Sequence, residues 1–83
     1  MVNSYVMAVL VDKRTEDAPR FQEVITKHGC LIRVRVGVHE VESCSEDGLI
    51  MLQLCGEDDD VQALLKEING LRSVRSKLMK LDF

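Results

Sequence analysis

Two polar segments of this 83-residue chain carry side chains that could do chemistry. The segment 39–47 holds His39 and Cys44, and an imidazole together with a soft thiolate suits nickel, copper or zinc. Two ligands per chain are too few for a metal site unless a second chain contributes others. The alternative interpretation is an exposed loop in which His39 and Cys44 bind nothing. The residues leave both interpretations open.

The other polar segment, 12–17, begins with Asp12, Lys13, Arg14 and Thr15. Charged runs of this kind are most often solvated connecting loops. The segment has no glycine-rich cradle for a phosphate, and no Ser/His/Asp or Cys/His pairing in the chain has a supporting third residue. We therefore expect a protein that is not an enzyme and needs no cofactor.

Composition narrows the class of protein further. Eighty-three residues, 46% of them hydrophobic, are enough for one domain spanning 1–83. The net charge of −3 argues against direct nucleic-acid binding through phosphate neutralisation. No apolar run approaches the ~20 residues that span a membrane, and residues 1–4 lack the features of a signal peptide. An odd count of three cysteines fits reduced thiols, so we expect a cytoplasmic protein.

The apolar pattern divides the chain into strand, helix, strand, strand, helix, strand. Strands are predicted at 5–11, 31–38, 49–55 and 74–81. Helices are predicted before Gly29 and before Gly70, because apolar residues recur there at helical spacing and glycine commonly ends a helix. Right-handed crossovers turn this order into an α+β, ferredoxin-like βαββαβ fold. The predicted sheet is antiparallel with strand order 4-1-3-2, and both helices cover one face.

The alternation in the second and third strands predicts how they pair. If Val38 lies opposite Gly48, the apolar positions of both strands share one face, namely Ile32, Val34, Val36, Ile50, Leu52 and Leu54. The helix-free face would then carry Met7 or Ala8, Leu49, Met51, Gln53, Cys55, Arg33 and Arg35. That mixture is too apolar to remain fully solvated, and the edge strand 31–38 lacks a proline. We expect a homodimer, joined by strand edges, sheet faces or both.

Two stretches carry a resemblance to a known family. Ile32–Val38, with Gly29 before it, and Ile68–Lys77 resemble the iron-only hydrogenase system regulators, which are short domains of ACT-like fold. The chain is also similar to the C-terminal regulatory domain of the nickel-responsive repressor, which forms tetramers. The resemblance implies a regulatory role, self-association as a dimer or tetramer, and a possible small-molecule effector or protein partner.

The same resemblance implies two sites. ACT-like domains bind small effectors, often amino acids, beside the loop after the first strand and at a subunit interface. Here Asp12, Lys13, Arg14 and Thr15 would meet a zwitterion, with Gly37 and Val38 giving access to the backbone. In the nickel repressor the ligands come from the second strand and the loop after it, where this chain has His39 and Cys44. Val34, Val36 and Gly37 stand where further histidines would be wanted.

Overall fold

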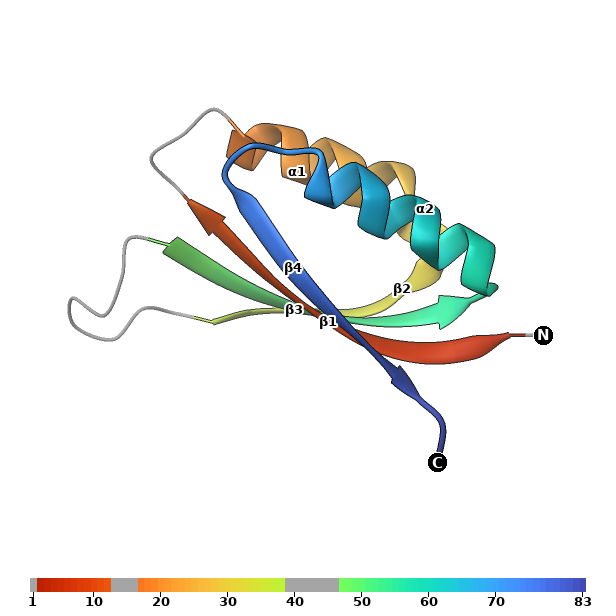
Figure 1. The fold of residues 1–83 in the computed structure, drawn as a ribbon. Coiled ribbons are helices and arrows are strands. Elements are labelled where there is room, and N and C mark those ends of the chain that lie inside the picture. The colour runs from red at the N-terminus through yellow and green to blue at the C-terminus, as the bar shows by residue number, and fades with distance from the viewer. Residues whose placement is uncertain (1, 13–16, 39–46) are drawn as a thin grey trace.

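A computed structural model describes residues 2–12, 17–38 and 47–83. Its elements in chain order are β1 (Asn3–Asp12), α1 (Asp17–Lys27), a short 3₁₀ turn η1 (Gly29–Leu31), β2 (Ile32–Val38), β3 (Asp47–Gly56), α2 (Asp58–Asn69) and β4 (Val74–Leu81). The predicted succession of elements is confirmed (Figure 1). β1 and β3 each begin two residues earlier than predicted, because their pairing extends from Asn3 opposite Gly56 to Asp12 opposite Asp47.

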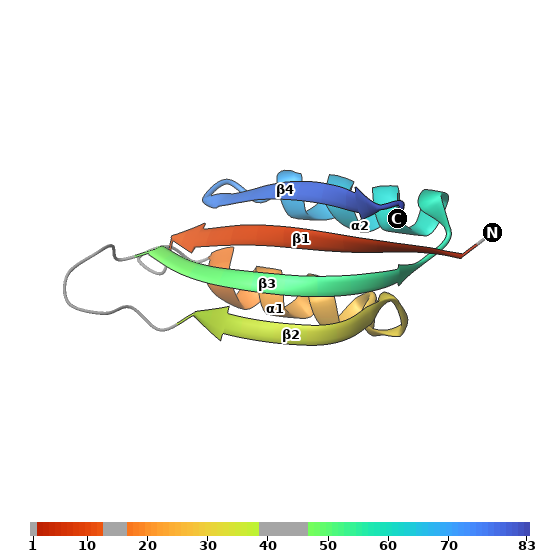
Figure 2. The same ribbon diagram turned by 90° about the horizontal axis from the view of Figure 1, so that it is seen from below.

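The four strands form one antiparallel sheet in the order β2-β3-β1-β4. Counted from the other edge, this is the predicted order 4-1-3-2, so the α+β, ferredoxin-like class is confirmed. Both α1 and α2 lie on the same face of the sheet, and no helix of the described residues lies over the other face (Figures 1 and 2).

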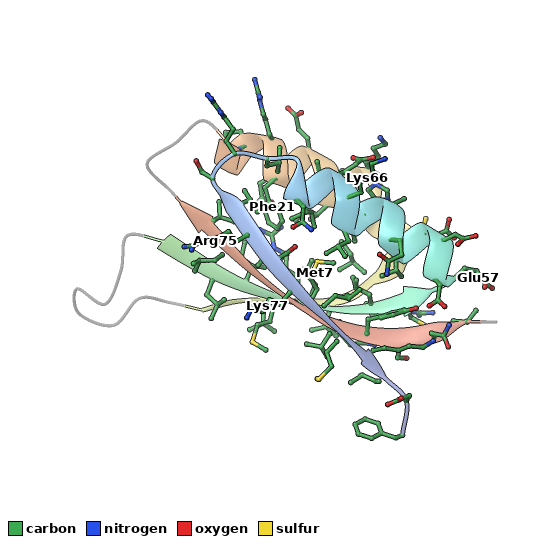
Figure 3. All side chains as sticks on the ribbon, in the orientation of Figure 1. Met7, Phe21, Glu57, Lys66, Arg75 and Lys77 are labelled. Carbon is green, nitrogen blue, oxygen red and sulfur yellow. The ribbon has the colours of Figure 1, made fainter. Side chains whose placement is uncertain are left out.

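The core lies between the sheet and the helices. The side chains of Met7 and Phe21 are fully buried there, whereas Lys77 lies on the opposite side of the sheet (Figure 3). The buried apolar residues are Tyr5, Met7, Val9 and Val11 of β1, Leu52 and Leu54 of β3, Val74 of β4, Phe21 and Ile25 of α1, Leu31 of η1, and Val61, Leu64 and Ile68 of α2. Burial of each large aliphatic or aromatic side chain stabilises the fold by about 1.5–3 kcal/mol.

The pairing of β2 with β3 differs from the predicted register. Ile32 lies opposite Leu54 as predicted, but Val34 lies opposite Gln53, because β2 contains one extra residue in a β-bulge between Ile32 and Val34. A one-residue shift moves every later side chain to the other face. The predicted register is therefore wrong from Val34 onward.

The bulge exchanges the two faces of β2. Val34 and Val36 share a face with Gln53 and Met51, away from the helices, and are 50% and 49% exposed. Arg35 was predicted on the helix-free face, but it lies on the helix side, where its Nη1 donates a hydrogen bond of 2.8 Å to Oε1 of Gln22 on α1. Apolar and polar residues alternate on both sides of the bulge. The sequence pattern therefore does not reveal that the apolar residues have changed from one face of the sheet to the other.

Candidate functional site at the strand ends and on the open face

The effector site implied by the resemblance falls at one end of the sheet. Asp12 is the last residue of β1 and lies opposite Asp47, and Val38 is the last residue of β2 and lies opposite Leu49. Both strands flank the beginning of β3, so their backbones end at the same edge of the molecule. Within the described residues, no atom lies within 4 Å of the position that a Cβ on Gly37 would occupy. The described part of the chain therefore leaves space beside the backbone near the end of β2.

Several predicted site residues lie outside the described residues: Lys13, Arg14, Thr15, His39 and Cys44. Their proposed roles remain predictions, as does the part that the side chains of Asp12 and Val38 would take. Within residues 2–12, 17–38 and 47–83, no three His, Cys, Asp or Glu side chains gather as a metal site would require.

The helix-free side of the sheet, called the open face below, is built from rows of residues that lie opposite one another across the strands. In the order β4, β1, β3, β2, these rows are Leu81, Ser4 and Cys55; Met79, Val6, Gln53 and Val34; Lys77, Ala8, Met51 and Val36; and Arg75, Leu10 and Leu49. The large hydrophobic side chains exposed on the described strands all belong to these rows. Met79 is 59% exposed and Met51 is 41% exposed. The sequence identified Leu49, Met51, Gln53 and Cys55 for this face and left Met7 or Ala8 open, which the structure decides for Ala8, but it missed the two valines.

The open face is uneven. A shallow hollow of about 300 Å³ lies over Ala8, with Leu10 and Leu49 beside it and Arg75 and Lys77 along one side. It arises because Ala8 is the shortest side chain of its row and lies between Lys77 and Met51. Arg75 and Lys77 are the charged residues among the described side chains of the open face, so this face is apolar with a basic flank on β4.

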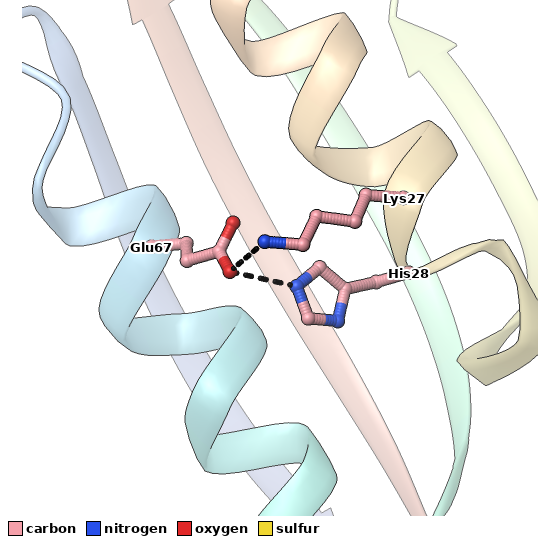
Figure 4. Close-up of polar contacts among 3 residues, drawn as sticks. All are labelled: Lys27, His28 and Glu67. Atoms are coloured by element: carbon pink, nitrogen blue, oxygen red, sulfur yellow. Dashed lines mark hydrogen bonds and ion pairs between the residues drawn. The ribbon is translucent and has the colours of Figure 1, made fainter.

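A separate polar cluster joins the two helices on the covered side (Figure 4). Nζ of Lys27 donates a hydrogen bond of 2.9 Å to Oε1 of Glu67 on α2, and Nε2 of His28 lies 3.3 Å from the same oxygen. The hydrogen bond from Lys27, followed by the contact with His28, lowers the pKa of Glu67 below its usual 4.5. His28 follows α1, as predicted, but its carboxylate partner is 39 positions away and no local signal indicates it. The cluster has the character of a structural contact between the two helices rather than that of a reactive site.

Comparison with solved structures identifies the fold. A protein described as uncharacterized, TM1266 from Thermotoga maritima, superposes with a TM-score of 0.90 at 23% identity, covering 99% of this chain and 100% of that one. The ACT domain of the GTP pyrophosphokinase of Chlorobium tepidum superposes with a TM-score of 0.72 at 13% identity, covering 98% of this chain and 100% of that domain. The chain has an ACT-like fold.

The remaining comparisons give no further information about the function of this ACT-like domain. The C-terminal domain of the MgtC protein from Mycobacterium tuberculosis has a TM-score of 0.72 at 9% identity, covering 96% of this chain and 88% of that one. By sequence, the ACT-like domain matches no family model and no curated protein. Neither α1 nor α2, the two helices of its described part, has the length and hydrophobicity needed to cross a lipid bilayer.

Proposed function

We propose that the chain is a non-catalytic regulatory module that self-associates and binds a small effector where β1 and β2 end. The observation that supports this most directly is the superposition of nearly the whole chain on a complete ACT domain. The sequence resemblance to the iron-only hydrogenase system regulators supports a place for the module in hydrogenase regulation.

The proposed effector is an amino acid or a similar small zwitterion. Its ammonium group would meet the carboxylate of Asp12, and its carboxylate would meet Lys13 and Arg14, with a hydroxyl at Thr15. Gly37 and Val38 would offer backbone groups from the neighbouring strand end. A ligand held between two copies shifts their arrangement only by its difference in affinity for the two arrangements.

Thermal unfolding in the presence of individual amino acids tests this proposal. A ligand at 100 times its Kd stabilises the folded state by about 2.7 kcal/mol, which is a clear rise in Tm for a domain of this size. The double variant Lys13→Ala/Arg14→Ala should lose the rise. Lys66→Ala, which removes an exposed cation of α2, is the matched control and should keep it. No rise with any amino acid would leave only the version in which the regulator binds a protein partner.

A second candidate is a metal-responsive domain that uses His39 and Cys44 across a dimer. The support is chemical: both donors occur in the short segment between β2 and β3, and together they suit nickel or zinc. Titration with each metal should then give a binding isotherm that Cys44→Ala abolishes, while Cys30→Ala, at an exposed thiol, leaves it unchanged. Identical isotherms for Cys44→Ala and the unaltered protein would remove this candidate.

A further inference from the structure

The open face gathers exposed apolar side chains from three of its strands. On the described strands, every large hydrophobic side chain that is exposed belongs to this face, and these side chains come from β2, β3 and β4. A contiguous apolar patch bordered by polar residues is typical of a binding surface. Figure 2 shows the same face with all four strands unobstructed.

The size of the face matches a modest protein interface. Four strands about 4.8 Å apart, with about eight residues rising 3.3 Å each, give roughly 500 Å² of flat area per copy. Two such faces packed together bury on the order of 1,000 Å², the lower limit for a specific interface. This area fits a reversible dimer better than an obligate one.

We infer that the open face packs against the open face of a second copy, with the strands of the two sheets aligned and β4 of each copy over β2 of the other. The inference rests on the self-association in the proposed function and specifies its surface. A two-fold axis parallel to the strands places each row over the same row of the partner. The strands then follow in the opposite order, so that β4 lies over β2 and β1 lies over β3. Met51 of one copy then lies over the hollow at Ala8 of the other, so a large side chain fills the space left by a small one.

Repulsion between like charges favours an axis along the strands over an axis across them. An axis across the strands would place β4 over β4 and put the basic flanks of both copies on the same side of the dimer, where like charges repel. The axis along the strands sends the two basic flanks to opposite sides of the dimer. Lys77 of each copy then lies over Val36 of the other, and its aliphatic stem can cover that exposed valine.

Sedimentation of the full chain tests the surface. The protein should sediment at twice its 9.4 kDa mass at micromolar concentration, and Met51→Glu should reduce it to a monomer by raising the dimer Kd at least about tenfold. Gln62→Glu adds the same charge at an exposed position of α2 and should remain a dimer. Circular dichroism of Met51→Glu should match the unaltered protein, since Met51 is not part of the core.

The outcomes separate this inference from the proposed function. If Met51→Glu is folded and still a dimer, the copies pair by another surface, so the inference fails and the proposed self-association stands. If the unaltered protein is a monomer at every concentration, both the inference and the proposed self-association fail. The effect of amino acids on Tm is a separate readout that neither result determines.

Cross-linking tests the axis. In a chain with its three cysteines replaced by serine, Val34→Cys with Met79→Cys should be linked between copies by a short bismaleimide. The two positions lie on opposite edge strands of one sheet, about 14 Å apart, so a short reagent does not join them within a chain. Met79→Cys alone should stay unlinked. Efficient linking of Met79→Cys alone would place β4 over β4 and overturn the proposed arrangement.

Discussion

The covered face and the open face of the sheet draw on one central strand that is apolar throughout. Along β1, Tyr5, Met7, Val9 and Val11 point toward the helices and are buried, whereas Val6, Ala8 and Leu10 alternate with them on the open face. The covered face is completed by residues of the same chain, from α1 and α2. The open face has the apolar character of a buried surface without a cover from the described part of its own chain. The difference teaches that hydrophobic residues in a strand indicate a buried surface. They do not indicate whether the same chain or another molecule covers it.

Truncation of a core residue gives the largest expected contrast between the faces. Phe21→Ala should lower the free energy of unfolding by about 3–5 kcal/mol, because Phe21 is completely buried against the sheet. Met51→Ala should lower it by less than about 1 kcal/mol in dilute monomer, because Met51 is 41% exposed there. Denaturant unfolding below the dimer Kd measures both, and equal losses would mean that the two faces do not differ as described.

Two glycines sharpen the comparison between tight and open packing. A Cβ on Gly56 would lie 2.5 Å from Cδ2 of Leu31, in the region where η1 packs beside β3, so Gly56→Ala should cost about 1–3 kcal/mol by overpacking. Gly37→Ala adds the same methyl at a position with no atom of residues 2–12, 17–38 or 47–83 within 4 Å and should be nearly neutral. Urea unfolding of both variants checks this, and a neutral Gly56→Ala would show that Leu31 moves aside freely.

A hydroxyl scan tests the bulge in β2. Val36→Thr should change the free energy of unfolding by no more than about 0.5 kcal/mol, because the bulge places this side chain on the open face. Val9→Thr puts the same hydroxyl into the core and should cost about 1–3 kcal/mol. The comparison should again be made in dilute monomer. A core-like cost at Val36 would restore the register without a bulge.

The smallest expected effect concerns the cluster between the helices. Because the pKa of Glu67 is lowered in the folded protein, its contribution to stability is present above pH 4.5 and is lost as the pH falls through the folded value. When the pH is lowered, the Glu67→Gln variant should therefore lose less stability than the unaltered protein does. Glu23→Gln, at an exposed glutamate of α1, should retain the original profile. Thermal melts from pH 6 to pH 3, a range that brackets the usual Glu67 pKa of 4.5, measure the difference.

Much of the molecule follows from local pattern. The helices were predictable because Phe21 and Ile25, and Val61, Leu64 and Ile68, recur at the helical period, and a glycine follows shortly after the end of each. The sheet order was predictable because connection lengths and crossover handedness leave few alternatives. For the candidate site at the strand ends, only the position in the fold was predictable, since the backbone at Asp12 and at Val38 lies at one end of the sheet. The roles of the other candidates remain predictions, namely those of Lys13, Arg14, Thr15, His39 and Cys44.

The sequence by itself determined the succession of elements, the helix-facing residues of β3 and an apolar side of the sheet left without helices. Only the tertiary structure decided which side chains of β2 lie on that side, and it also brought Glu67 to Lys27 and His28. The physical reason is one of range. Periodicity reports which residues of one segment share a face, but a single extra residue in a ladder reverses the faces without altering the period. Contacts between distant segments depend on how whole elements pack, and no local pattern records that.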